Sequence, residues 1–208
     1  MAWIKTISYT NAVGKLKSIY ERVKGPDNNV DNILMAHSLR PHTLEGHMTL
    51  YKYVLHHPAN TLPKWLLEAI GVYVSLLNKC DYCVSHHQAG LDRLLNNDKK
   101  AATVRDALEK GTPSAASKFL SERDIGALDY AKLLTDTPSA VTELSIQDLR
   151  AFGLDDGEIL EVNQVVAYFA YANRTVLGLG VVTEGDIIGL SPTAKPGTID
   201  SPDDWSHT

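Results

Sequence analysis

The 208-residue sequence has few cysteines, no long apolar run and no excess of positive charge. Two cysteines are too few for the disulfide framework of a small secreted scaffold. No run approaches the ~18 apolar residues of a membrane span, and the N-terminal segment lacks a signal-peptide core. Twenty Lys and Arg against 25 Asp and Glu give a net charge of −5, with no basic run to attract phosphate backbones. We therefore expect a cytoplasmic protein that binds neither membranes nor nucleic acids.

Helical spacing of apolar residues dominates the chain, and strand-like alternation is almost absent. Two helices begin at capping-box patterns, Ser121-x-x-Asp124 and Asp155-x-x-Glu158. Asp98 is the expected N-cap of a charged helix that ends before Gly111. The remaining expected helices cover residues 13–23, 32–39, 44–55, 65–77 and 81–95. The pattern predicts an all-α fold.

The composition suits one packed domain. Hydrophobic residues make up 44% and charged residues 22% of the chain, which excludes fibrous and disordered classes. The length fits one full-sized domain or two small ones. The stretches 62–78 and 120–135 are loosely similar, but neither half can bury its apolar faces alone, so one helical domain over residues 1–182 is expected. The Gly, Pro, Asp, Ser and Thr content beyond it predicts an irregular tail over residues 183–208.

The residues suited to chemistry lie between Glu68 and His87. Cys80 and Cys83 form a C-x-x-C pair at the start of an expected helix, where free N–H groups and the helix dipole stabilise a thiolate. His87 follows Cys83 by four residues on the same helical face. If the two helices that meet at Lys79 form an antiparallel hairpin, Glu68 and His87 lie roughly 4–5 Å apart along the axis. A nucleophilic thiol, a histidine base beside it and a carboxylate that orients the imidazole are typical of activated-thiol sites.

The spacing Glu-x11-Cys-x2-Cys-x3-His resembles the signature of alkylhydroperoxidase D (AhpD)-like proteins in the carboxymuconolactone decarboxylase superfamily. The motif region covers residues 62–95, and four residues agree with the signature at all three spacings. Residues 36–41, the pair His86-His87 and residues 172–174 resemble the peroxidase-related subgroup. The resemblance therefore extends over most of residues 1–182 and implies an AhpD-like helical bundle.

The resemblance also implies a role for each motif residue. Cys83 would be the peroxidatic thiol, Cys80 the resolving thiol, His87 the base that helps to keep Cys83 as thiolate, and Glu68 its relay partner. The substrate would be a small-molecule hydroperoxide. No cofactor or metal is implied, and an external dithiol, such as a lipoyl or thioredoxin-like reductant, would reset the pair.

One position departs from the AhpD-like pattern, which has a relay histidine directly before the second cysteine. This sequence has Tyr82 there. Because the ordinary pKa of tyrosine is about 10, it is a poor proton shuttle near neutrality. His86 is the alternative relay residue.

Two other functions remain open at the same motif. A C-x-x-C pair is also half of a zinc site, which His86 or His87 and a distant histidine would complete in a non-catalytic redox or metal-binding helical module. The second alternative is decarboxylase-like action on a small cyclic acid, although the decarboxylase branch lacks the paired cysteines.

Residues outside the motif give weaker signals. Asn173 and Arg174 either line a pocket or, for the arginine, pair with a carboxylate of a neighbouring helix or subunit. Apolar residues on more than one face of 65–77 and 165–179 predict a homo-oligomer. Five further histidines carry no motif spacing and are expected at the surface or an interface: His37, His42, His47, His56 and His57.

Overall fold

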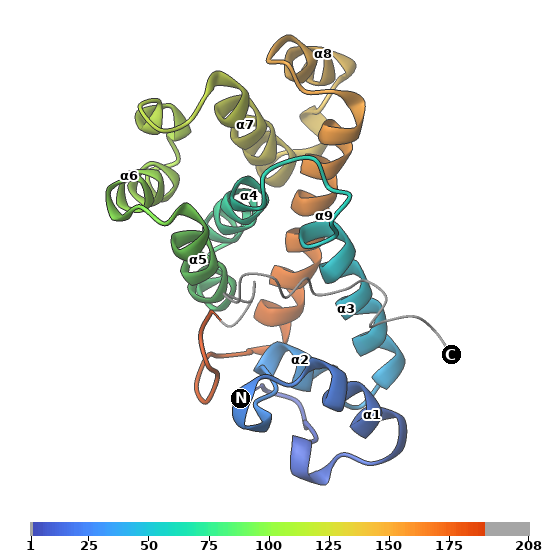
Figure 1. Cartoon of the computed structure of the whole chain (residues 1–208). Helices are drawn as coiled ribbons and strands as arrows, with labels where there is room; N and C mark the ends of the chain where they lie inside the picture. The colour runs from blue at the N-terminus through green and yellow to red at the C-terminus, as the bar shows by residue number, and fades with distance from the viewer. Residues whose placement is uncertain (1, 190–208) are drawn as a thin grey trace.

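The computed structural model describes residues 2–189, and regular structure in this part of the chain is helical throughout, as predicted (Figure 1). The α-helices are α1 (Gly14–Val23), α2 (Asn32–Ala36), α3 (Pro41–Leu55), α4 (Lys64–Leu77), α5 (Asp81–Leu95), α6 (Asp98–Glu109), α7 (Glu122–Asp136), α8 (Glu143–Ala151) and α9 (Asp156–Leu179). Short 3-10 helices lie at Tyr9–Asn11, Pro26–Asn28, Pro113–Ala116 and Pro138–Ala140. Figure 1 shows α9 running along the molecule, from α8 at one end towards α2 at the other.

The core of the fold is built around α4. Every residue from Leu66 to Ser75 is buried, because α5, α7 and α9 all pack against this helix. Gly71 lets α9 approach closely, since a Cβ atom at this position would overlap the ring of Phe169. The centre of the fold therefore holds α4, and with it Glu68, in a fixed position.

Local signals set most helix ends where the sequence predicted them. Ser121 and Asp155 cap α7 and α9 through complete capping boxes. The N-cap of α6 is Asn97, and Asp98 is the first helical residue. The prediction that Asp98 is the N-cap was therefore wrong by one position. The Asn97 side-chain oxygen accepts a hydrogen bond from the backbone N–H of Lys100 at 2.9 Å, which fixes this register.

Two helices differ from the sequence-based prediction. The second helix ends at Ala36 and not at residue 39, because residues 37–39 form a turn before Pro41 starts α3. The sequence did not predict α8, whose one buried residue is Leu149. A helix with so little buried surface lacks the apolar periodicity that sequence analysis uses.

The segment after α9 is irregular but fixed by contacts. Residues 181–189 form no helix, and 190–208, most of the predicted irregular tail, lie outside the described residues. The Asn32 side-chain amide donates to the carbonyl oxygens of Val182 and Glu184, at 2.8 and 2.9 Å. This segment therefore returns to the amino end of α2.

The described surface carries apolar side chains, but none of the described helices is long and apolar enough to span a membrane. On α9, Leu160, Tyr171 and Leu177 are exposed. A homo-oligomer would cover such a surface, and it stays a prediction.

Candidate redox site at the C-x-x-C pair

A tight reversal between α4 and α5 places both cysteines at the start of α5. Lys79 takes a left-handed conformation, with φ of +57°, and Cys80 follows as the N-cap. The backbone N–H of Cys80 donates to the carbonyl oxygen of Ser75 at 2.9 Å, and Val84 N–H donates to Cys80 O at 3.0 Å. Cys83 thus lies in the first turn of α5, as the sequence predicted.

The two thiols are free, buried and in contact. Cys80 is 0% exposed and Cys83 is 3% exposed. The two cysteines lie 3.3 Å apart, and their side chains share a hydrogen bond. A dithiol this close needs only a small movement to form a disulfide.

The electrostatics of the pair differ from the expectation of a thiolate at Cys83. The hydrogen bond from the Cys83 thiol, the backbone N–H of Cys83 and the amide of Asn173 lower the pKa of Cys80. The Cys83 pKa is raised by its bond to Cys80 and by burial. The physical reason is hydrogen bonding within the pair: Cys83 donates to the Cys80 sulfur, whereas the neighbouring Cys80 and burial oppose ionisation of Cys83. These contacts favour ionisation of Cys80 over ionisation of Cys83.

The predicted pair of Glu68 and His87 is present. Glu68 Oε2 lies 2.8 Å from His87 Nδ1, and the carboxylate is 1% exposed. The ring of Phe169 meets the imidazole edge to face, with ring centroids 4.7 Å apart. The contact with Glu68 occupies Nδ1, so Nε2 is the ring nitrogen that exchanges protons. His87 shares a helix face with Cys83, which lies one turn earlier.

Asn173 is a functional candidate to which the sequence gave no definite role. It is fully buried on α9, where its Nδ2 donates to Ser75 Oγ at 3.1 Å and its Oδ1 accepts from Asn78 Nδ2 at 3.0 Å. Its amide also adjoins both thiols. The neighbouring Arg174 donates to the carbonyl oxygen of Ala170 in its own helix, and a carboxylate partner from another subunit stays a prediction.

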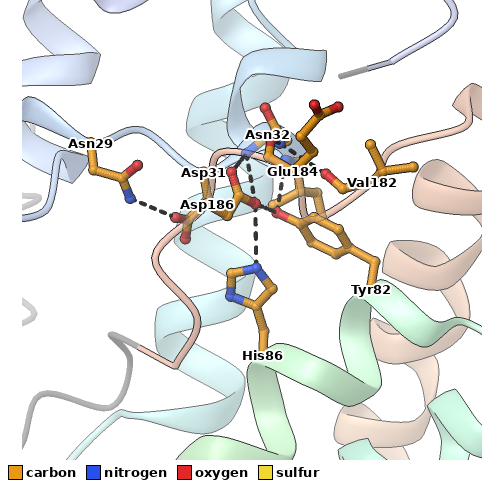
Figure 2. Close-up of polar contacts among 9 residues, drawn as sticks. Asn29, Asp31, Asn32, Tyr82, His86, Val182, Glu184 and Asp186 are labelled. Atoms are coloured by element: carbon orange, nitrogen blue, oxygen red, sulfur yellow. Dashed lines mark hydrogen bonds and ion pairs between the residues drawn. The ribbon is translucent and has the colours of Figure 1, made fainter.

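Tyr82 and His86, the candidate relay residues, both turn towards Asp186 (Figure 2). The Tyr82 hydroxyl donates to Asp186 Oδ2 at 2.6 Å, and His86 Nε2 lies 3.3 Å from the same oxygen. Burial and the charge of Asp186 raise the pKa of Tyr82 far above its ordinary value. Tyr82 therefore holds its proton at neutral pH. Asp186 itself was missed, because it lies in the segment predicted to be an irregular tail.

A row of rings continues from His87 across α3 and α9. Tyr51 lies between His87 and Tyr168, with ring centroids 6.3 and 5.8 Å away, and His47 lies 5.9 Å beyond Tyr168. His47 is 4% exposed, and His56 is buried too, so the expectation of surface histidines was wrong for both. The reason is that α3 packs on α9, which buries the helix face that carries His47.

The buried His47 predicts a pH-dependent stability. Burial, and secondarily the charge of His37, lower the pKa of His47 to about 3. The unfolded chain takes up this proton near pH 6.5, so acid favours unfolding between these two pH values. From pH 6.5 to 4.5, we expect the unfolding free energy of the wild type to fall by about 2 kcal/mol more than that of His47→Leu. Urea unfolding at both pH values measures this, and equal decreases would contradict it.

Among residues 2–189, no group of three or more His, Cys, Asp or Glu side chains is placed so that it could hold a metal ion. The zinc alternative therefore has no ligand set in the described part of the chain.

Comparison with solved structures identifies the fold. A peroxidase-related protein from Ralstonia eutropha JMP134, described as an alkylhydroperoxidase AhpD core, matches with a TM-score of 0.74 and 20% identity. The match covers 88% of this chain and 92% of that chain. The chain has the AhpD-like fold. No protein-family model and no curated protein matches the sequence.

Further structures share the AhpD-like fold. A peroxidase-related protein from Silicibacter sp. TM1040 matches with a TM-score of 0.66 and 24% identity, over 80% of this chain and 83% of that chain. The debrominase Bmp8 matches with a TM-score of 0.68 and 19% identity, over 86% and 91% of the two chains. The fold implied by the sequence resemblance is therefore confirmed.

Proposed function

We propose that the protein is a thiol-dependent, peroxidase-like oxidoreductase that reduces hydroperoxides through Cys80 and Cys83. The observation that carries this proposal is the buried Glu68 carboxylate on His87, one helical turn from a cysteine that is hydrogen-bonded to a second cysteine. The fold is not the argument, because the debrominase Bmp8 has a similar one. The side chains at the site support the reaction.

The first step is attack by Cys83 on the terminal oxygen of the hydroperoxide. The Cys83 thiol, in hydrogen-bond contact with Cys80, passes its proton to His87, one turn further along α5. The O–O bond breaks, Cys83 becomes a sulfenic acid, and His87 returns a proton to the departing alkoxide. Glu68 keeps the imidazole oriented and stabilises its protonated form.

The second step is condensation of the two cysteines. The Cys80 sulfur attacks the sulfenic sulfur, and water leaves as the disulfide forms. An external dithiol, of the lipoyl or thioredoxin type, then reduces the disulfide by thiol exchange. The cycle needs no resident cofactor, and a cytoplasmic location would keep the resting pair reduced.

A brief hydroperoxide pulse followed by mass spectrometry tests the proposal. One equivalent of cumene hydroperoxide should convert the reduced protein to a species two hydrogens lighter, and peptide mapping should assign the change to a Cys80–Cys83 disulfide. The double variant Cys80→Ser/Cys83→Ser is the control and should keep its mass. Wild-type cysteines that stay reduced under excess hydroperoxide would contradict the function and favour the alternatives without thiol chemistry.

A further inference from the structure

The Asp186 carboxylate contacts Tyr82 and His86 of α5, and the proposed reaction gives it no role. It belongs to the segment after α9, which returns to α2 and α5 (Figure 2). The backbone N–H of Asn32 donates to Oδ1 at 3.0 Å and approaches Oδ2 at 3.2 Å, while the Tyr82 hydroxyl donates to Oδ2. His86 Nε2 lies near the same oxygen. The Asp186 side chain is 1% exposed, so these donors replace the water that a surface carboxylate would bind.

Tyr82 links this carboxylate directly to the redox pair, because it stands between the two cysteines in sequence. Its hydroxyl donates to Asp186 at 2.6 Å and also accepts the backbone N–H of Ile33 at 3.1 Å. The His86 ring packs on the Tyr82 ring, with centroids 4.7 Å apart. The first turn of α5 is therefore tied through one side chain to both α2 and the segment 181–189.

A second carboxylate lies near the contact between Tyr82 and Asp186. Asp31 also lies in the cluster and accepts a hydrogen bond from Asn29 Nδ2 at 3.1 Å. Burial raises the pKa of Asp31, the charge of His86 lowers it, and the charge of Asp186 raises it. With a second carboxylate this near, the 2.6 Å hydrogen bond from Tyr82 is a principal contact of the Asp186 carboxylate.

We propose that Asp186 is a positioning residue for the Cys80–Cys83 couple, and that it acts through Tyr82. The small movement that closes the pair to a disulfide falls on the N-cap and first turn of α5, which carry Cys80 and Cys83 and which Tyr82 shares. The hydrogen bond to Asp186 is made in the dithiol state and resists this movement. Asp186 therefore favours the dithiol and makes the disulfide easier to reduce.

The inference rests on the redox couple of the proposed function, but its test needs no hydroperoxide. Each protein is equilibrated with mixtures of reduced and oxidised dithiothreitol, in which the two thiols pass two electrons and two protons to the oxidised reagent. Asp186→Ala and Tyr82→Phe should each raise the equilibrium constant for the Cys80–Cys83 disulfide about tenfold, as expected for a lost hydrogen bond to a charged group. The double variant should show no larger shift than either single variant.

Asn32→Ala is the matched control for a merely structural role. It removes the side-chain hydrogen bonds that hold the carbonyls of Val182 and Glu184, so it loosens the same segment but leaves the bond between Asp186 and Tyr82. Its melting temperature should fall, while its disulfide equilibrium constant should stay within about twofold of wild type. An equal shift in Asn32→Ala would assign the effect to docking of the segment and overturn the proposal. If Asp186→Ala does not fold, Tyr82→Phe, which loses one hydroxyl, decides the matter.

The outcomes separate this inference from the proposed function. An unchanged equilibrium constant in both single variants, additive shifts, or a wild type that forms no disulfide in oxidised dithiothreitol would each overturn the role of Asp186. Shifted constants in a protein that ignores hydroperoxides would overturn the peroxidase proposal alone. Hydroperoxide reduction with unshifted constants would overturn the role of Asp186 alone.

Discussion

Cys83→Ser is expected to abolish hydroperoxide consumption, whereas Cys80→Ser should consume one equivalent and then stop. Cys83 is one helical turn from His87, so loss of its sulfur removes the atom that attacks the peroxide. Without Cys80, the Cys83 sulfenic acid forms but has no thiol with which to condense. The measurements are hydroperoxide consumed per protein and the mass of a dimedone adduct on the remaining cysteine.

The two serine variants are matched controls for each other. Both positions are buried, both belong to the first turn of α5, and each variant loses one sulfur of the same hydrogen-bonded pair. Because hydrogen bonds lower the pKa of Cys80 while the pKa of Cys83 is raised, the experiment also distinguishes ease of ionisation from reactivity. A dimedone adduct on Cys80 in Cys83→Ser, with none on Cys83 in Cys80→Ser, would exchange the two roles.

The helical fold and the contact between Glu68 and His87 were accessible from the sequence because both depend on local rules. The two residues lie on consecutive helices joined by a short turn, and the rise per residue fixes which positions of such a hairpin face each other. Capping boxes at Ser121 and Asp155 likewise act over three residues and set the starts of α7 and α9. Patterns confined to one or two neighbouring helices are sufficient for such predictions.

The parts that were missed depend on contacts between distant segments. Asp186 meets Asn32, which is 154 residues earlier, and lies in a stretch with no helical periodicity. The burial of His47 depends on which face of α3 packs against α9, and no spacing within α3 determines this.

Which of the two cysteines has the lower pKa was not predictable from the sequence, and the reason here is different. A helix dipole acts on both cysteines of a C-x-x-C pair at a helix start, so it does not choose between them. The choice is made by hydrogen-bond geometry. Cys83 donates to Cys80, which lowers the pKa of Cys80, and Asn173 on α9 adds a second donor.

Glu68→Gln and His87→Gln are expected to slow the oxidation of Cys83 by similar factors, of order 10²–10⁴, as for a general acid–base group. The carboxylate reaches the reaction only through the imidazole, since its Oε2 is held by His87 Nδ1 at 2.8 Å and the whole group is buried. Once the imidazole is absent, removal of the Glu68 charge has no further group to act on. The double variant should therefore be about as slow as either single variant, a strongly non-additive result.

Stopped-flow measurement of the first turnover gives the rate constant for each variant, free of the later reduction by an external dithiol. Glu161→Gln is the control for loss of a carboxylate that holds structure alone, because Glu161 accepts the backbone N–H groups of Thr61 and Leu62, at 2.8 and 2.9 Å. It should leave the oxidation rate constant unchanged. Losses that multiply in the double variant of Glu68 and His87 would show that the two residues act independently, and would remove the relay from the mechanism.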